Sequence, residues 1–155
     1  MNRRKLIEMT EEECASFLGD AKTISVASLD PRGWPHIVAM WFCLIDGRVH
    51  MTTFKKSQKA VNLRRDPRVT FLAESGATYA ELRGVMVRGE AALIDDTEFC
   101  ADVLLRVQRR GYFGDVGEGP EVRDALRAQA SKRVVIRIDP RHVSSWDHSK
   151  LAGAY

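Results

Sequence analysis

The chain has 155 residues and a mass of 17.5 kDa, which suits one core of ordinary size, so we expect a single domain over residues 1–155. Hydrophobic residues make up 45% and charged residues 29%, which excludes a disordered chain. No apolar run approaches the roughly 20 residues that cross a bilayer. The net charge of +3 is smaller than nucleic-acid-binding proteins usually carry and suits a small anionic ligand.

The N-terminal segment MNRRKLIEMTEEEC has acidic residues where a signal peptide would need an apolar stretch. We therefore expect a cytoplasmic protein. The cysteines are odd in number, far apart and outside any C-x-x-C motif, which indicates neither a disulfide framework nor a zinc site. We expect small buried side chains at these positions: Cys14, Cys43 and Cys100.

The first predicted element is a helix that begins after Thr10. Thr10 and Glu13 have the spacing of a capping box, and the next apolar residues fall on one helical face: Cys14, Phe17 and Leu18. A strand is predicted over residues 22–29, where polar and apolar residues alternate. The letters DPRG at 30–33 then predict a type I turn.

The segment PHIVAMWFCLIDGRVHMTTF, residues 35–54, predicts a long apolar strand, an Asp-Gly hairpin turn and a return strand. Ser57 can cap a short helix that runs through Arg65 and ends before Pro67. The letters RVTFLAES, residues 68–75, predict the next strand of the sheet.

The segment YAELRGVMVRGEAALID, residues 79–95, predicts a long strand in which Gly84 and Gly89 indicate bulges or the close approach of another backbone. Asp96 can cap a helix, and Pro120 can start another that ends near Lys132. RVVIRIDP and HVSSW then predict a strand and an extension. Antiparallel strands with tight turns and a few helices indicate a β-barrel with helices at its ends.

Catalysis by protein side chains alone has no supporting motif. The patterns G-x-S-x-G, G-x-x-x-x-G-K-[ST] and G-x-G-x-x-G are all missing. The histidines share no metal-ligand spacing, so we expect no metal site from His36, His50, His142 and His148.

The segment TTFKKSQKAVNLRRDPRV, residues 52–69, places basic residues where a strand meets a helix. Lys55, Ser57 and Lys59 supply the ammonium groups, the hydroxyl and the helix N-terminus that a phosphate needs. The same letters also fit a solvated lysine-rich turn, and composition alone favours that interpretation. Three further cations are typical of exposed charges near a helix C-terminus: Arg64, Arg65 and Arg68.

The longer segment VHMTTFKKSQKAVNLRRDPRVTFLAE resembles the phosphate-binding segment of the pyridoxamine 5'-phosphate oxidase-like split-barrel flavoproteins. The matching residues are Met51, Thr52, Ser57, Lys59 and Pro67. LRGVMVRGEAALID is similar to the family's next strand, and HVSSW places Trp146 at a tryptophan that packs beside the flavin. The resemblance spans residues 23–146, apart from the helical insert at 96–132.

This resemblance implies a mainly β (α+β) fold, namely a six-stranded antiparallel split β-barrel with a few peripheral helices. It also implies a homodimer that binds its cofactor at the subunit interface. The cofactor-binding residues it implies are Val38, Met40, Trp41, Thr52, Thr53, Lys55, Ser57, Lys59, Arg64 and Trp146.

Two substitutions and the chain's last residues depart from the oxidases. Gln58 stands where they have a phosphate-binding arginine, and Gly84 stands where they have a glutamine. After Trp146 the chain reads DHSKLAGAY and lacks their Arg-x-His substrate motif, which argues against pyridoxamine phosphate as a substrate. The chain is more similar to the actinobacterial deazaflavin-dependent reductases, which implies deazaflavin (coenzyme F-420) or FMN as the cofactor. Cations that could line a groove for the deazaflavin's glutamate tail are Lys55, Lys56, Arg64 and Arg65.

We therefore expect an oxidoreductase that transfers hydride between this cofactor and a small organic acceptor, without nucleic-acid or membrane partners. The ring could pack on Trp41 or Trp146, with His36, Met40 and His50 as further candidates, whereas Trp34 fits a structural role. The proton source stays open among solvent, Tyr112, His148 and Tyr155. Two alternatives remain: a non-catalytic flavin, deazaflavin or haem binding protein, and a barrel that binds single-stranded nucleic acid.

Overall fold

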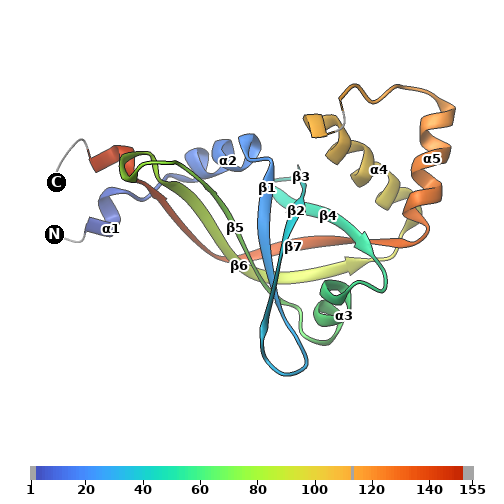
Figure 1. The fold of residues 1–155 in the computed structure, drawn as a ribbon, viewed down its shortest axis with the longest axis horizontal. Coiled ribbons are helices and arrows are strands. Elements are labelled where there is room, and N and C mark those ends of the chain that lie inside the picture. The colour runs from blue at the N-terminus through green and yellow to red at the C-terminus, as the bar shows by residue number, and fades with distance from the viewer. Residues whose placement is uncertain (1–2, 113, 152–155) are drawn as a thin grey trace.

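The structure is a computed structural model that describes residues 3–112 and 114–151, and within them seven antiparallel strands form one sheet (Figure 1). Across the sheet the order is β2-β1-β5-β6-β7-β4-β3. The strands are β1 (Thr23–Leu29), β2 (Pro35–Trp41), β3 (Cys43–Ile45), β4 (Arg48–Phe54), β5 (Arg68–Ser75), β6 (Arg83–Ile94) and β7 (Arg133–Asp147).

The expected number of six strands is wrong, because the long strand predicted from Pro35 breaks at Phe42. The part before the break, β2, pairs with β1, and the part after it, β3, pairs with β4. These are the two edges of the sheet, so the chain passes directly from one edge to the other at Phe42. The side chain of Phe42 is fully buried. The sheet therefore curls into a half-barrel whose edges meet at this residue.

The helices are α1 (Arg3–Leu6), α2 (Glu11–Asp20), α3 (Gln58–Arg65), α4 (Thr97–Val107) and α5 (Pro120–Ala130). Three predicted caps are confirmed: the Glu13 amide donates to Thr10 Oγ1, the Ala60 amide to Ser57 Oγ, and the Phe99 amide to Asp96 Oδ1. Short 3₁₀ turns lie at Tyr79–Glu81 and His148–Leu151, and a π-helical turn at Gln108–Tyr112 extends α4. The sequence patterns predicted neither α1 nor this π-helical turn.

Both predicted tight turns are confirmed. The Gly33 amide donates to the Asp30 carbonyl at 3.0 Å, which closes the turn between β1 and β2. Asp46 and Gly47 have φ angles of 50° and 72° and connect β3 to β4. The short hairpin favours this left-handed backbone, which glycine adopts without strain.

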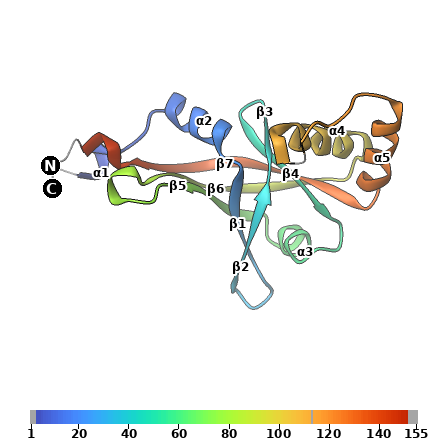
Figure 2. The same cartoon turned by 45° about the horizontal axis from the view of Figure 1, so that its top comes forward.

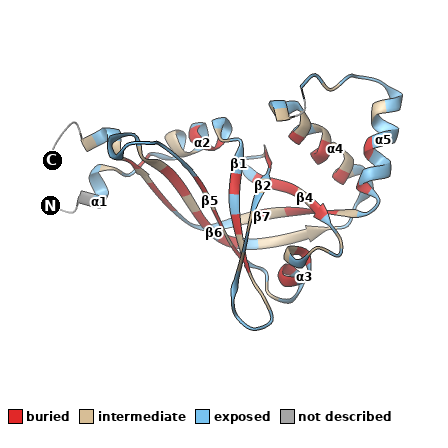
Figure 3. Ribbon diagram, in the orientation of Figure 1, coloured by how far each residue is buried: buried red, intermediate tan, exposed pale blue. Residues whose placement is uncertain are grey.

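Two apolar clusters hold the fold together (Figure 3). The first fills the interior of the half-barrel, where Phe17 and Leu18 of α2 and Leu63 of α3 pack onto the strands. The second lies between α4, α5 and the outer face of β3, β6 and β7. Figure 2 shows α2 and α4 on one side of the long β6 and β7 ribbon and α3 on the other. Thus α2 and α3 pack onto the interior cluster, whereas α4 and α5 cover the outer face of the sheet.

Gly89 permits a close approach of two backbones. The register of β6 and β7 shifts between Arg88 and Gly89, and a Cβ atom on Gly89 would lie 2.3 Å from the Asp139 carbonyl oxygen. No other residue fits here without moving β7. The predicted bulge is therefore confirmed at Gly89.

The three cysteines are free. Cys43 and Cys100 are buried, as expected, and burial raises the pKa of each thiol to about 11. Cys14 is only half-buried.

No helix in the described ranges is both long and apolar enough to span a membrane.

Candidate functional site

The end of β4 and the start of α3 bring together three of the residues implied as cofactor ligands: Thr53, Ser57 and Lys59. The Ser57 amide donates to the Phe54 carbonyl at 3.0 Å, which turns the chain into α3. Thr53 Oγ1 donates to Ser57 Oγ at 2.9 Å, and Lys59 Nζ donates to Thr53 Oγ1 at 3.1 Å. We call Thr53, Ser57 and Lys59 the Lys59 corner. It places an ammonium group and two hydroxyls at a helix N-terminus, where the first amides have no partner inside the helix.

The electrostatics of the Lys59 corner favour an anion. Burial lowers the pKa of Lys59 below its ordinary 10.5, and the nearby charge of Arg133 lowers it further. Arg133 stacks its guanidinium 4.2 Å from the ring centre of Phe54. Its Nε is buried and has no hydrogen-bond partner among the described residues. No carboxylate among the described residues forms an ion pair with Lys59. A bound anion would therefore give Lys59 and Arg133 the partner of opposite charge that each lacks.

Arg133 was missed by the sequence reasoning. It is the first residue of β7 and pairs with Phe54 across the sheet. The letters SKRVVIR give no sign of this neighbour, because the helical insert separates the two strands in sequence. Only the register of β4 and β7 brings Arg133 to the corner.

Three other cations of this segment are engaged within the chain, whereas Lys56 is exposed. Lys55 Nζ lies 2.7 Å from Asp95 Oδ1. Arg64 Nη1 donates to the Lys55 carbonyl at 2.7 Å, and Arg65 donates to the Leu29 carbonyl. Lys55, Arg64 and Arg65 thus fix the loop, the helix and the turn between β1 and β2. A groove for a polyanionic tail would need these contacts to break.

Gln58, which replaces an expected arginine, anchors α3. Its Nε2 donates to Asn62 Oδ1 at 2.8 Å, and Asn62 Nδ2 donates to Ser28 Oγ at 3.1 Å. Asn62 is fully buried. These hydrogen bonds connect α3 to β1. Gln58 therefore helps to fix the position of α3, the helix that carries Lys59.

Alternation along the strands divides the remaining implied ligands between two faces. Met40 packs against the interior cluster, and Val38 shares its face of β2. Trp41 lies on the opposite face and stacks on Tyr112 with ring centres 4.6 Å apart. Thr52 likewise faces away from buried Thr53. Val38, Met40 and Thr53 therefore share the interior face, while Thr52 and Trp41 lie on the outer one.

Trp146 lies over the backbone of Gly84. The two residues face each other across β6 and β7, and a Cβ atom on Gly84 would lie 2.3 Å from Cζ2 of the indole. The predicted close approach at Gly84 is thus made by a side chain and not by a backbone. Replacement of the oxidases' glutamine by glycine makes room for this ring, which stays half-buried.

Trp146 and the Lys59 corner lie at opposite ends of β7. Thr53 pairs with Val134 at the start of that strand, and Trp146 stands near its end. At about 3.3 Å per residue the path along β7 between them is roughly 40 Å, and Figure 1 shows β7 running along the whole half-barrel. The two groups therefore lie at opposite ends of one long strand.

The residues considered as proton sources or ring contacts are scattered. Tyr112 donates its hydroxyl to the Lys22 carbonyl, and the ring of His148 lies 4.4 Å from that of Tyr79. His50 is buried beneath α4, where its ring meets the edge of Phe99. Half-buried His36 lies on β2, and Trp34 is 71% exposed at the turn that precedes it. Tyr155 lies outside the described residues.

Within the described ranges, no group of three or more histidine, cysteine or acidic side chains is placed to hold a metal ion.

Comparison with known proteins identifies the family. Residues 10–147 match the family model described as pyridoxamine 5'-phosphate oxidase. The chain belongs to this family. A search of the curated proteins found no match.

Three solved structures with a similar fold cover a range of sequence identity. A conserved hypothetical protein from Mycobacterium tuberculosis is 42% identical, with a TM-score of 0.88 over 96% of this chain and 91% of that one. An F420 reductase is 27% identical, with a TM-score of 0.68 over 87% and 98%. A haem storage protein from Vibrio cholerae, at 22% identity and a TM-score of 0.64 over 86% and 92%, shares the fold alone.

Proposed function

We propose that the protein is an oxidoreductase that transfers hydride between a bound deazaflavin and a small organic acceptor, with FMN as the alternative cofactor. The observation that carries this proposal is the Lys59 corner together with neighbouring Arg133: Lys59, Ser57 and Arg133 can donate to an anion, and no carboxylate of the described residues pairs with Lys59 or Arg133. The F420 reductase, 27% identical over most of both chains, supports the choice of deazaflavin. Membership of the pyridoxamine 5'-phosphate oxidase family supports a cofactor of the flavin type.

The chain's own residues position the cofactor. Lys59 and Arg133 would neutralise the phosphate, and Ser57 would hold one of its oxygens. The bound cofactor would supply the hydride chemistry. The protein would orient the ring and exclude water from the face that meets the acceptor.

The cofactor would lie between two copies of the chain. Support comes from the positions of Trp146 and the Lys59 corner at opposite ends of β7. A two-fold dimer would bring Trp146 of one chain close to Lys59 of the other. Exposed apolar side chains also favour an interface, because such groups gain free energy when a partner covers them. The largest of these near β2 and the corner are Trp34, Ile37, Trp41 and Phe54.

Titration of the purified protein with deazaflavin and with FMN tests the function. We expect at least one cofactor to quench the tryptophan fluorescence with a dissociation constant in the micromolar range. Addition of an enone or quinone should then oxidise the bound, reduced cofactor. Binding of neither cofactor would refute the proposal. Binding without hydride transfer to any acceptor would leave a carrier protein and also contradict the proposed activity.

The lowered pKa of Lys59 predicts how cofactor affinity depends on pH. The charged form of Lys59 binds the anion, so affinity should stay constant near neutrality and fall as pH rises through a pKa below 10.5. Each pH unit above that pKa should cost up to about tenfold in affinity. Fluorescence titrations at increasing pH, with circular dichroism to verify folding, measure this. In Lys59→Arg the decline should move to higher pH, and an unchanged profile would show that Lys59 is not the titrating ligand.

A further inference from the structure

A cavity of about 470 Å³ opens at the α2 end of the half-barrel interior, at the other end of that interior from the Lys59 corner. Residues of α2 form one wall, and the turn between β3 and β4 forms another. The floor consists of side chains that are at most 4% exposed: Phe71, Val85, Val87 and Ile138. Its size falls in the range of small-molecule sites.

The interior of this cavity has few groups that could form hydrogen bonds with water. Ser145 is the hydroxyl residue on its wall, and that hydroxyl accepts a hydrogen bond from the Met9 amide at 3.0 Å. The floor is aliphatic and aromatic. Water in such a space makes few hydrogen bonds, so an apolar group would displace it at a gain in free energy.

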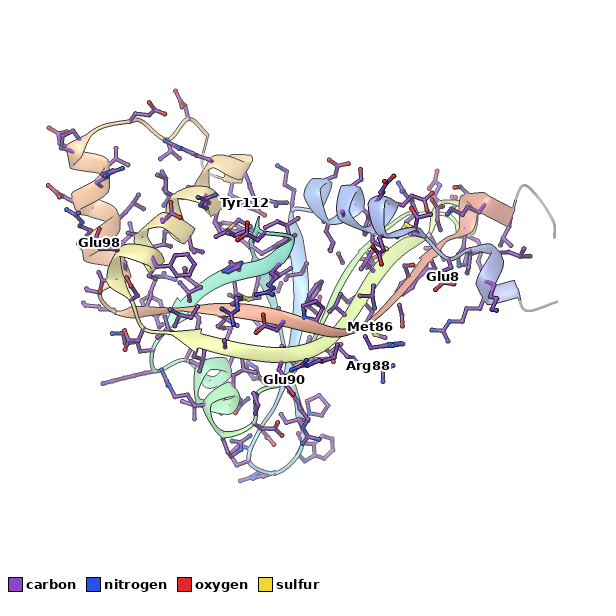
Figure 4. All side chains as sticks on the ribbon, turned by 180° about the vertical axis from the view of Figure 1, so that it is seen from behind. Glu8, Met86, Arg88, Glu90, Glu98 and Tyr112 are labelled. Atoms are coloured by element: carbon purple, nitrogen blue, oxygen red, sulfur yellow. The ribbon has the colours of Figure 1, made fainter. Side chains whose placement is uncertain are left out.

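The rim of the cavity carries two carboxylates that pair with no described side chain. Glu8 and Glu11 stand on the rim, and neither side chain makes a hydrogen bond or ion pair with another described residue. Lys150 lies close, but its Nζ contacts the Glu8 carbonyl oxygen and the carboxylate of Glu13. Figure 4 shows Glu8 on the segment that leads into α2. The rim is therefore acidic although the whole chain has a net charge of +3.

The cation on the opposite side of the rim is already paired. Arg48 Nη1 lies 3.4 Å from Asp139 Oδ1, and Asp139 also accepts hydrogen bonds from Arg137. Glu11 also lies in the first turn of α2, where an acidic residue stabilises the helix. That role explains Glu11, but it explains neither Glu8 nor the apolar space beneath both.

We propose that this cavity binds a small organic cation, whose apolar body fills the interior and whose protonated amine lies at Glu8 and Glu11. The apolar body of the ligand would contact Phe71 and Val87, and its ammonium group would pair with the carboxylates at the rim. The site is separate from the Lys59 corner, so it does not depend on the proposed redox function. No covalent chemistry is required of it.

Cys14 provides a built-in reporter, because it lies on the cavity wall and is half-buried. Cys43 and Cys100 are buried and their raised pKa keeps them unreactive, so iodoacetamide should alkylate Cys14 selectively. The alkylation rate, followed by mass spectrometry, is measured with three probes that share one body: 3-phenylpropylamine, 3-phenylpropanol and 3-phenylpropanoate. Each probe changes only the charge of the head group.

We expect the amine to slow alkylation of Cys14 with a dissociation constant of about 1 mM or tighter, and to bind about threefold to fivefold more tightly than the alcohol. The carboxylate should bind most weakly. The double variant Glu8→Gln and Glu11→Gln should lose the preference for the amine. Glu12→Gln, one residue further along α2 and outside the cavity, should keep it.

Three outcomes would overturn the proposal. Equal protection by all three probes would show an apolar cavity without the ionic selection. No protection by any probe would show that the cavity binds none of them. If Cys14 were protected from alkylation without any probe, and this protection were lost on dilution, a second copy of the chain would cover the cavity.

Discussion

Replacement of Lys59 by glutamate should weaken cofactor binding at least about 100-fold. The change removes a half-buried ammonium group from the Lys59 corner and puts a negative charge beside the phosphate. A charge-assisted hydrogen bond contributes about 1.5–3 kcal/mol, and repulsion from the new carboxylate adds to that loss. Fluorescence titration with deazaflavin and FMN measures the dissociation constants.

Lys56→Glu is the matched control for Lys59→Glu. Lys56 lies in the same turn and is exposed, so the same change of charge should have only a small effect that salt screens. If Lys59→Glu bound the cofactor as tightly as Lys56→Glu, the phosphate would have to bind elsewhere. A thermal unfolding curve for each variant separates lost binding from lost folding.

Gly84→Ala should displace Trp146 and weaken cofactor binding about tenfold or more. The new methyl group would lie 2.3 Å from Cζ2 and 2.5 Å from Cε2 of the indole, so the ring must leave its place on β6. Overpacking of this kind costs about 1–3 kcal/mol of stability. The tryptophan emission spectrum and the cofactor titration report the two effects separately.

The double variant Gly84→Ala with Trp146→Ala distinguishes a clash from a general weakness of the strand. Removal of the indole also removes the clash, so adding Gly84→Ala to Trp146→Ala should cost little further stability. Gly19→Ala is the control, because a Cβ atom there meets nothing within 4 Å. Wild-type emission and affinity in Gly84→Ala would show that Trp146 does not depend on the glycine.

Local patterns in the sequence predicted most of the elements. Thr10, Ser57 and Asp96 marked helix starts because a cap depends on only a few neighbouring residues. The break at Phe42 escaped prediction, because PHIVAMWFCLI is apolar throughout and its pattern does not tell which neighbour each half pairs with. The π-helical turn at Gln108–Tyr112 was equally hidden.

The candidate site was only partly predictable for a similar reason. Ser57 and Lys59 are close in sequence, so their meeting follows from one turn and one helix. Arg133 joins them through the register of β4 and β7 across the helical insert, which no local pattern reveals. Lys55 was expected on the phosphate but pairs with Asp95, a residue that becomes its neighbour only in the folded sheet.

Mixing two defective variants tests the two-chain site most directly. Lys59→Glu lacks a working corner and Trp146→Ala lacks the ring contact, so neither homodimer should bind cofactor normally. In a mixed two-fold dimer one site would combine both changes, and the other would contain the native Lys59 and the native Trp146. After equal amounts are unfolded and refolded together, about one site in four should regain wild-type affinity in a fluorescence titration. If the mixture forms dimers but no high-affinity sites appear, the cofactor does not lie between Lys59 of one chain and Trp146 of the other.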